Sequence, residues 1–469
     1  MATALSSLVS TGLSTGSGSS SSSATGGFVG LGQGINVTSF VQAAEANAQA
    51  NITNVQDEQT SVNGQNSELA TITSDLTALQ TATAALQDPL GALADQTATS
   101  SAPNDVNATA TSEAQAGTHT ISITSLATTS SYYSDPVATG STPLGTGDTI
   151  AISVGGVQQA SVTVTSSNNT LADIAAAINN QTTGVQASVI TDANGARLDI
   201  VSTTSGAPGA IAITGTLHDA SGNAIDLHQA VAGANAVLTV DGVPISSASN
   251  TVSGVINGVT LSLLGPTGGT PASLTVAPDT TGATAAINSF VSAYNTAITA
   301  INGQFQAGAT PSTSPPLETD SSLSDAQAQL LSAASYSVPG NSGSLSLASI
   351  GISTNDDGTL TVDSNALASA LSTNYSGVQS FFQTASTGFA QNISNVLNNL
   401  VGGTGELTLD AQGYTAQSSD LTQQISDLQA ALAVQTTNLT ATYAQVNDTL
   451  EELPLLQSQL SQQLSSLPT

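Results

Sequence analysis

The last part of the chain repeats an aliphatic side chain at every seventh position. Gln, Ser, Thr, Asn and Ala fill most positions between these residues, with almost no charge. A repeat of seven keeps one narrow apolar stripe facing a single partner while two helices supercoil. The pattern predicts a long helix that needs a partner, and its stripe consists of Ile425, Leu432, Leu439, Val446, Leu453, Leu460 and Leu467.

A second helical pattern lies near the other end of the chain. Two rows, each spaced by seven residues, form the adjacent positions of one seam. Asp88-Pro89 predicts the end of this helix, because the residue before proline avoids helical geometry. The first row is Val55, Val62, Leu69 and Leu76, and the second is Ile72, Leu79 and Leu86.

Two interpretations of these helices remain open. They can be unrelated amphipathic helices that pack on one globular core. Narrow stripes at opposite chain ends favour the other interpretation, in which the helices pair as an antiparallel coiled-coil stem and the residues between them form an insertion. Polar residues at Gln435, Thr442 and Thr449 replace the leucines of a permanent zipper, so we expect contacts that permit partner exchange.

The middle of the chain has a different texture. After Thr97, Thr and Ser alternate with Val and Ile, which is typical of half-buried strands. Helical spacing interrupts the strands at 171–180 and resumes at Ile287. Because helices and strands are segregated, we predict a multidomain α+β fold with nested β-rich head domains. Hairpin turns are predicted at Asn194-Gly195, Asp241-Gly242, Asn257-Gly258 and Asp357-Gly358.

These patterns divide the chain into six segments. A Ser/Gly/Thr-rich leader, which we expect to be disordered and without a cleaved secretory signal, comes first. A helical leg, two β domains, a mixed stem domain and the last helix follow. The expected boundaries are 1–34 for the leader, 35–97 for the amino-terminal leg, 98–135 with 235–282 for the inner β domain, 136–234 for the inserted outer β domain, 283–410 for the stem domain and 411–469 for the coiled-coil helix.

Composition excludes several classes of function. The formal net charge is −30, Arg197 is the only basic side chain, and Cys and Lys are absent. A phosphate-binding lysine, a Schiff base, a thiol nucleophile and a cysteine zinc site are therefore impossible. The charge also excludes nucleic acid and anionic membranes as partners. No apolar stretch approaches the roughly 20 residues that span a bilayer, so we expect no membrane insertion.

Only 7% of the residues are charged, so Ser, Thr, Asn and Gln must keep the surface soluble. Two hypotheses explain the missing cations. In an acidic exterior the carboxylates become neutral, and few cations remain to repel one another. Alternatively, the chain escapes extracellular proteases that cut after Lys or Arg.

The residues that usually carry chemistry form no recognisable site. No metal-ligand spacing involves His119, His218 or His228. Ser353 and Ser364 occupy the first and twelfth positions around Asp357-Gly358, where a calcium loop needs acidic ligands. Arg197 either pairs with a carboxylate such as Asp199 or points into water. We predict no catalytic residue, no metal, no cofactor and no enzymatic activity.

Several short blocks occur in one order along the chain. They include Gly34–Val41, Gly117–Ile121, Leu171–Asn179, Ile256–Leu261, Phe290–Asn295 and Asp357–Leu360. From about residue 34 to its end, the chain resembles the flagellar filament cap family, also called hook-associated protein 2. The block at 171–179, with Gly184–Ala187, resembles the flagellin hook IN element. The sequence departs from a regular helix at Pro454, inside the last predicted helix. This proline should kink the helix or remove a hydrogen bond.

The resemblance implies a homo-oligomeric ring, commonly of five subunits, at the growing tip of the flagellum. Exported flagellin would fold and insert beneath this ring, and the hook–filament junction protein and host or mucus surfaces are further implied partners. The implied location is extracellular, after export by the flagellar type III route. A cell-surface adhesin whose β domains bind glycans is the alternative function. A glycoside hydrolase and a junction protein or flagellin are further alternatives, which the ordered blocks disfavour.

Overall fold

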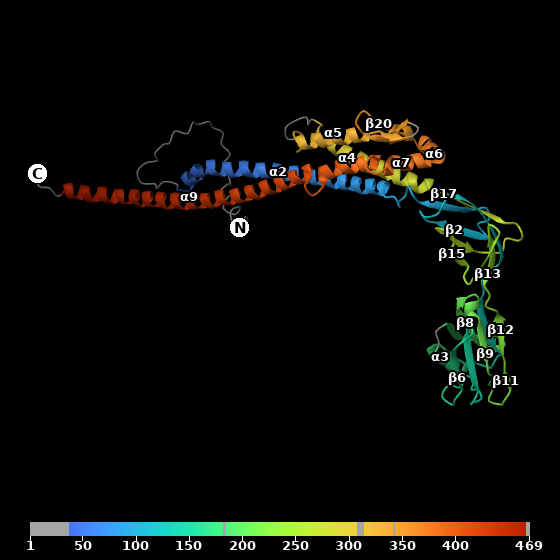
Figure 1. Ribbon diagram of the computed structural model, residues 1–469. Coiled ribbons are helices and arrows are strands. Elements are labelled where there is room, and N and C mark those ends of the chain that lie inside the picture. The colour runs from blue at the N-terminus through green and yellow to red at the C-terminus, as the bar shows by residue number, and fades with distance from the viewer. Residues whose placement is uncertain (1–36, 182–183, 307–313, 341–342, 466–469) are drawn as a thin grey trace. The chain divides into compact units, whose positions relative to one another are not determined.

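The computed structural model describes residues 37–181, 184–306, 314–340 and 343–465. Figure 1 colours the chain from helix α2 (Val37–Gln87) to helix α9 (Glu406–Ser465). Strands fill most of the chain from Gln96 to Pro278, and shorter helices follow them. Helices and antiparallel sheets are segregated along the chain, which confirms the multidomain α+β class. No helix among these residues combines the length and apolarity needed to cross a membrane.

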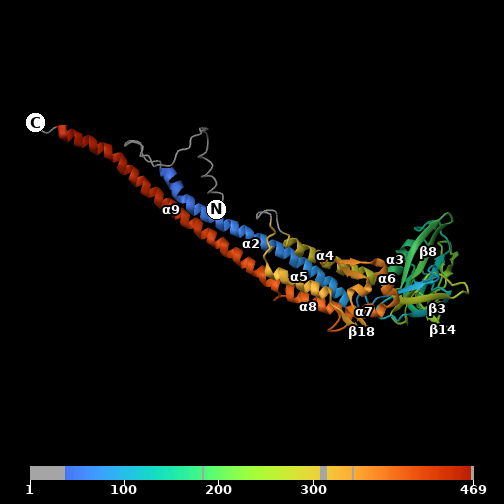
Figure 2. The same cartoon turned by 90° about the horizontal axis from the view of Figure 1, so that it is seen from above.

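The chain forms two compact units. Of the described residues, 37–66 and 412–465 form the first unit, and those between 67 and 411 form the second. Within the first unit, α2 and α9 run side by side in both Figure 1 and Figure 2. Helix α9 continues through Pro454 to Ser465. The proline therefore does not end the helix, although it has no N–H to donate to the preceding turn.

The second unit contains a helical region with an aromatic core. Phe290, Phe381, Phe382 and Phe389 are fully buried, and the rings of Phe290 and Phe389 meet edge to face at 5.6 Å. Aspartates precede three helices and accept N–H groups of the first turn, which stabilises each helix start. The helices are α4 (Thr280–Gln304), α5 (Ser321–Ala334), α6 (Ser364–Thr373), α7 (Tyr375–Gln383) and α8 (Phe389–Val401), with the small hairpins β18–β19 (Val338–Gly340, Gly343–Leu345) and β20–β21 (Ile352–Thr354, Leu360–Val362).

An inner β region packs two antiparallel sheets on one core. Alternate residues of each strand, such as Ile121, Leu238 and Leu274, fill this core. Asp241 and Gly242 both have positive φ in the predicted turn between β13 and β14. The five-stranded sheet has the order β1 (Gln96–Ser100), β17 (Ala272–Pro278), β3 (Gly117–Ser125), β13 (Ala236–Val240), β14 (Val243–Ser247), and the three-stranded sheet β15 (Thr251–Ile256), β16 (Val259–Leu263), β2 (Val106–Ala110).

An outer β region has its own core. Helix α3 (Leu171–Gln181) buries the apolar face that its spacing predicted, including Leu171, Ile174 and Ile178. The four-stranded sheet has the order β12 (Leu227–Val231), β4 (Thr129–Ser134), β8 (Gly195–Ser205), β7 (Val185–Asp192). The three-stranded sheet is β6 (Val157–Thr163), β5 (Thr149–Val154), β9 (Ile211–Thr214), with a short pair β10–β11 (Leu217–His218, Ala224–Ile225).

One expected border differs from the sheet topology. A border at residue 135 assigns the strand Thr129–Ser134 to the inner β domain. In the structure this strand, β4, pairs with β8 and β12, and its Tyr132 packs on the outer core. The sequence border fails there because a strand does not show which neighbours it pairs with. The leader expected at 1–34 lies outside the described residues.

Candidate assembly surface on the terminal helices

The amino-terminal half of α2 binds α9 through uncharged side chains and one glutamate. Residue numbers rise along α2 while those of the α9 partners fall, so the two helices are antiparallel. The bonded pairs are Glu45–Thr436, Gln59–Thr422, Asn63–Ser418 and Asn66–Thr415. Gln59 Nε2 donates to Thr422 Oγ1 at 2.6 Å, and Ser418 Oγ donates to Asn63 Oδ1 at 2.6 Å. The sequence analysis missed these polar contacts because it followed apolar positions.

Apolar side chains are buried along the same helix pair. Ile52, only 2% exposed, is buried on α2 with Val41 and Val62, and Leu421 and Leu432 are buried on α9. Of the other predicted seam residues in this unit, Val55, Ile425 and Leu439 are half-buried. The rows spaced by seven do not include Ile52 and Leu421, although both are buried. Ile52 lies three residues before Val55, and Leu421 lies four residues before Ile425, so the neighbouring helical row could have revealed both.

The predicted stripe separates from the buried face towards the end of α9. Val446, Leu453 and Leu460 are exposed, by 41%, 42% and 60% respectively. Buried and half-buried positions follow a spacing near 3.6 residues, as a straight helix requires, whereas the stripe follows 3.5. Between residues 421 and 443 these positions are Leu421, Ile425, Leu428, Leu432, Thr436, Leu439 and Tyr443. Leu467 lies outside the described residues.

The extent of α2 is a second reason why the stripe is exposed towards the end of α9. Glu45 bonds Thr436, and α2 begins at Val37, eight residues earlier. The antiparallel register therefore places the start of α2 opposite about residue 444 of α9. Beyond that position no described helix of this unit continues alongside α9. Its exposed aliphatic residues there include Leu453, Leu455, Leu456 and Leu460.

The other predicted α2 seam residues lie in the second unit. Leu69, Ile72, Leu76 and Leu79 are almost completely buried there. Polar side chains on this stretch of α2 bond shorter helices: Gln80 Nε2 donates to Asn398 Oδ1 of α8 at 2.7 Å. Burial in this unit does not identify the partner of these four residues, so their pairing with α9 stays a prediction. An apolar row shows that a face is buried but does not identify the helix that covers it.

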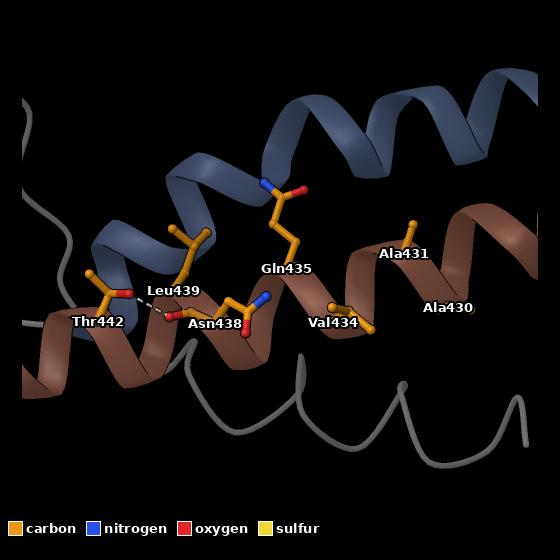
Figure 3. A pocket seen from close by; sticks show the side chains of 7 residues that line it. All are labelled: Ala430, Ala431, Val434, Gln435, Asn438, Leu439 and Thr442. Carbon is orange, nitrogen blue, oxygen red and sulfur yellow. Dashed lines mark hydrogen bonds between the residues drawn. The ribbon is translucent and has the colours of Figure 1, made fainter.

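A shallow groove of about 600 Å³ follows α9 beside the start of α2 (Figure 3). Its lining residues are Ala430, Ala431, Val434, Gln435, Asn438, Leu439 and Thr442. Gln435 and Leu439 extend toward the α2 ribbon in Figure 3. Val434 is exposed, and Thr442 Oγ1 donates to the Asn438 carbonyl oxygen at 2.8 Å. The groove thus combines small, apolar and uncharged polar side chains.

Gln435, Thr442 and Thr449 differ from their expected role. All three are exposed and not buried between α2 and α9. Thr449 Oγ1 also donates to the backbone, to the Gln445 carbonyl oxygen at 2.8 Å. A threonine that bonds its own preceding turn needs no partner for its hydroxyl. Thr442 and Thr449 therefore need no bond to α2, whereas Gln435, although exposed, extends toward the α2 ribbon (Figure 3).

The histidines bind aspartates that lie far away in sequence. His119 pairs with Asp241 at 2.8 Å, His218 with Asp148 at 3.0 Å and His228 with Asp135 at 2.9 Å. The His228 hydrogen bond lowers the pKa of Asp135, and the His119 hydrogen bond lowers that of Asp241. No group of three or more potential metal ligands gathers among the described residues.

Arg197 follows neither sequence expectation. Within the described chain it forms no ion pair with Asp199. Its NH1 donates to the Ser134 carbonyl oxygen at 3.1 Å, and its guanidinium lies 5.6 Å from the centre of the Tyr133 ring. Carbonyl and ring both come from β4, the strand next to Arg197 on β8. A cation over an aromatic face is attracted by the ring quadrupole.

Family models match three parts of the chain. The model described as flagellar hook-associated protein 2 N-terminus matches residues 33–130, and the corresponding C-terminus model matches residues 233–454. The flagellin hook IN motif matches residues 149–204.

Individual relatives extend this similarity. The B-type flagellar hook-associated protein 2 of Pseudomonas aeruginosa is 34% identical over 400 residues, covering 80% of this chain and 84% of the relative. The flagellar hook-associated protein 2 of Escherichia coli K12 is 30% identical over 397 residues, covering 79% of this chain and 84% of the relative. A crystal structure of the D1-D2-D3 domains of the E. coli flagellar cap protein matches with a TM-score of 0.58 and 32% identity, covering 74% of this chain and 99% of that one. This chain therefore belongs to the flagellar hook-associated protein 2 family.

Proposed function

We propose that this protein forms the cap at the distal tip of a flagellar filament and promotes the folding and insertion of exported flagellin. The E. coli structure that it resembles is described as a flagellar cap protein. We further propose a structural and not an enzymatic role, outside the cell and after export by the flagellar route. Several copies, five by family resemblance, would form the cap.

The exposed end of α9 carries this proposal. Leu453, Leu455, Leu456 and Leu460 are 42–63% exposed on a stretch that has no described helix beside it. In proteins, most of the stability of a helix comes from packing its apolar face against a partner. Such a segment suits a helical partner that is present only in the assembled filament. We propose that flagellin provides this partner.

The chemistry of the paired helices fits repeated attachment and release. Amide and hydroxyl groups form most of the side-chain hydrogen bonds between α2 and α9 described above, and each contributes only about 0.5–1.5 kcal/mol. Neither helix contains Lys or Arg, so no ion pair with a permanent cation can strengthen the contact. Extended contacts of small individual strength allow a cap to move as subunits are added beneath it.

Replacing Leu455 and Leu456 with Gln tests this function. Both side chains are already exposed, so the helix should remain folded while its apolar face is lost. A strain that carries only this variant should secrete flagellin monomer and form few filaments. Leu409→Gln is the matched control, because Leu409 is an exposed leucine near the start of α9. Normal filaments with the double variant would contradict the role of this face.

Deletion of the whole chain separates a cap from an adhesin. A strain without a cap should release flagellin into the medium and fail to swim. A strain without an adhesin should still build filaments and swim, so that result would overturn the cap proposal.

A further inference from the structure

The outer β region presents an exposed face with aromatic and aliphatic side chains. The four-stranded sheet β12-β4-β8-β7 buries Leu198 and Ile200 on one side, so their neighbours along β8 lie on the other side. On that opposite face Tyr133, Ile190 and Val231 are 38%, 53% and 42% exposed. Three large side chains are thus exposed on one face of this sheet, which is called the patch below.

Arg197, the only permanent cation of the chain, lies among these residues. It is directly opposite Ile190 in the β7–β8 register, and its guanidinium lies over the Tyr133 ring. Its hydrogen bond to the Ser134 carbonyl uses one of five guanidinium N–H groups. Among the described residues, no carboxylate forms an ion pair with the guanidinium. The group is thus held in place and can still bind an acceptor from outside.

Neighbouring contacts fix this arrangement across three strands. The Tyr133 ring lies 5.4 Å from the His228 ring, and His228 Nε2 meets Asp135 Oδ1 at 2.9 Å. The carboxylates of Asp135 and Asp199 border the patch. Asp135 is bonded to His228, and Asp199 is directly opposite Tyr133 in the register. Partial burial raises the pKa of Asp199.

Tyrosine and arginine are enriched at the centres of protein interfaces. We propose that this outer-face cluster, Tyr133, Ile190, Arg197, His228 and Val231, binds a second copy of the chain, with a carboxylate of that copy accepting hydrogen bonds from Arg197. Each copy carries 31 acidic residues and one basic residue. Any ion pair between copies that uses a permanent cation must therefore involve Arg197. The inference rests on the proposed function, which requires several copies.

The experiment measures the mass of the purified full chain by light scattering over a range of concentrations. Arg197→Gln and Ile190→Ser should each weaken self-association about tenfold, because both remove the centre of the contact. Val157→Ser is the control, since Val157 is exposed on β6, in the other sheet of the outer region. Unchanged melting temperatures would show that the variants remain folded.

The single arginine provides a second readout. Phenylglyoxal modifies guanidinium groups, and intact-mass analysis would follow its addition to Arg197. The rate should fall as the concentration, and therefore the fraction of assembled copies, rises. Oligomers that withstand both cluster variants, or an Arg197 rate independent of concentration, would overturn the inference. A wild-type chain that stays monomeric would overturn it as well.

These outcomes are separate from those that test the cap. If assembly withstands the cluster variants while deletion of the chain still abolishes filaments, the cap function stands and only this contact fails. If deletion leaves filaments intact, the cap function itself fails.

Discussion

Ile52→Ala tests the packing between the terminal helices. Ile52 is 2% exposed on the part of α2 that faces α9. The change removes three carbon atoms, or about 2.4 kcal/mol of transfer free energy at about 0.8 kcal/mol each. The two helices can move together and partly fill the cavity, which limits the additional free-energy cost of that cavity. Alanine also favours the helix over isoleucine by a few tenths of a kcal/mol. We therefore expect a loss of about 2 kcal/mol.

Hydrogen exchange with mass spectrometry measures this loss locally in the full chain. A loss of about 2 kcal/mol corresponds to about thirtyfold faster exchange by local opening. The acceleration should appear in peptides from 41–62 and also in peptides from 421–436, because the two helices open together. Val434→Ala, at an exposed position of α9, should change exchange little. Acceleration confined to α2, with α9 unaffected, would refute the pairing.

The unusual charge content of the chain leads to three further predictions. The melting temperature of the terminal helix pair should not fall when NaCl is raised from about 0.01 M to 0.15 M, because its charged residues are all acidic and salt weakens only their mutual repulsion. A marked fall would contradict pairing without attractive ion pairs. Trypsin should cut only after Arg197, and slowly, because β8 lies between β4 and β7 in the folded sheet, so the cleavage rate should follow the opening of that sheet. Rapid cleavage of the native chain would contradict this protection, and Arg197→Gln is the uncleavable control. The hydrogen bond with His228 lowers the pKa of Asp135. The ionised carboxylate therefore stabilises the fold above the ordinary carboxyl pKa, near 4, and this stabilisation is lost as pH falls below that value. Asp135→Asn should reduce the fall in melting temperature at acid pH, and an unchanged fall would refute the assignment.

Periodicity predicted part of the fold because it reports which face of an element is buried. The apolar face of α3 is buried as predicted, and Val62 and Leu432 of the expected seam are buried. Partner identity is a different property. The stripe from Leu69 to Leu79 is buried in the second unit, where α2 bonds α8, and nothing in its spacing distinguishes that partner from α9.

Other features depend on contacts between distant residues. Val446 is exposed for two reasons: α9 keeps 3.6 residues per turn, and α2 begins at Val37. Neither property can be read from the apolar pattern of α9. The His228–Asp135 bond joins residues 93 positions apart, through the pairing of β12 with β4. The position of Arg197 over Tyr133 depends in the same way on the pairing of β4 with β8. Local sequence cannot reveal these pairs, because sheet registers create them.

The distance between residues 63 and 418 tests the antiparallel pairing of the chain ends most directly. The chain has no cysteine, so nitroxide labels on Asn63→Cys and Ser418→Cys would be the only two spins in each molecule. Double electron–electron resonance should give one short distance, because the native side chains meet at 2.6 Å. Moving the second label to Asp427→Cys shifts it by about 13 Å along α9 and should lengthen the distance. Equal distances for the two label pairs, or a short distance that disappears when labelled chains are diluted with unlabelled ones, would contradict pairing within one molecule.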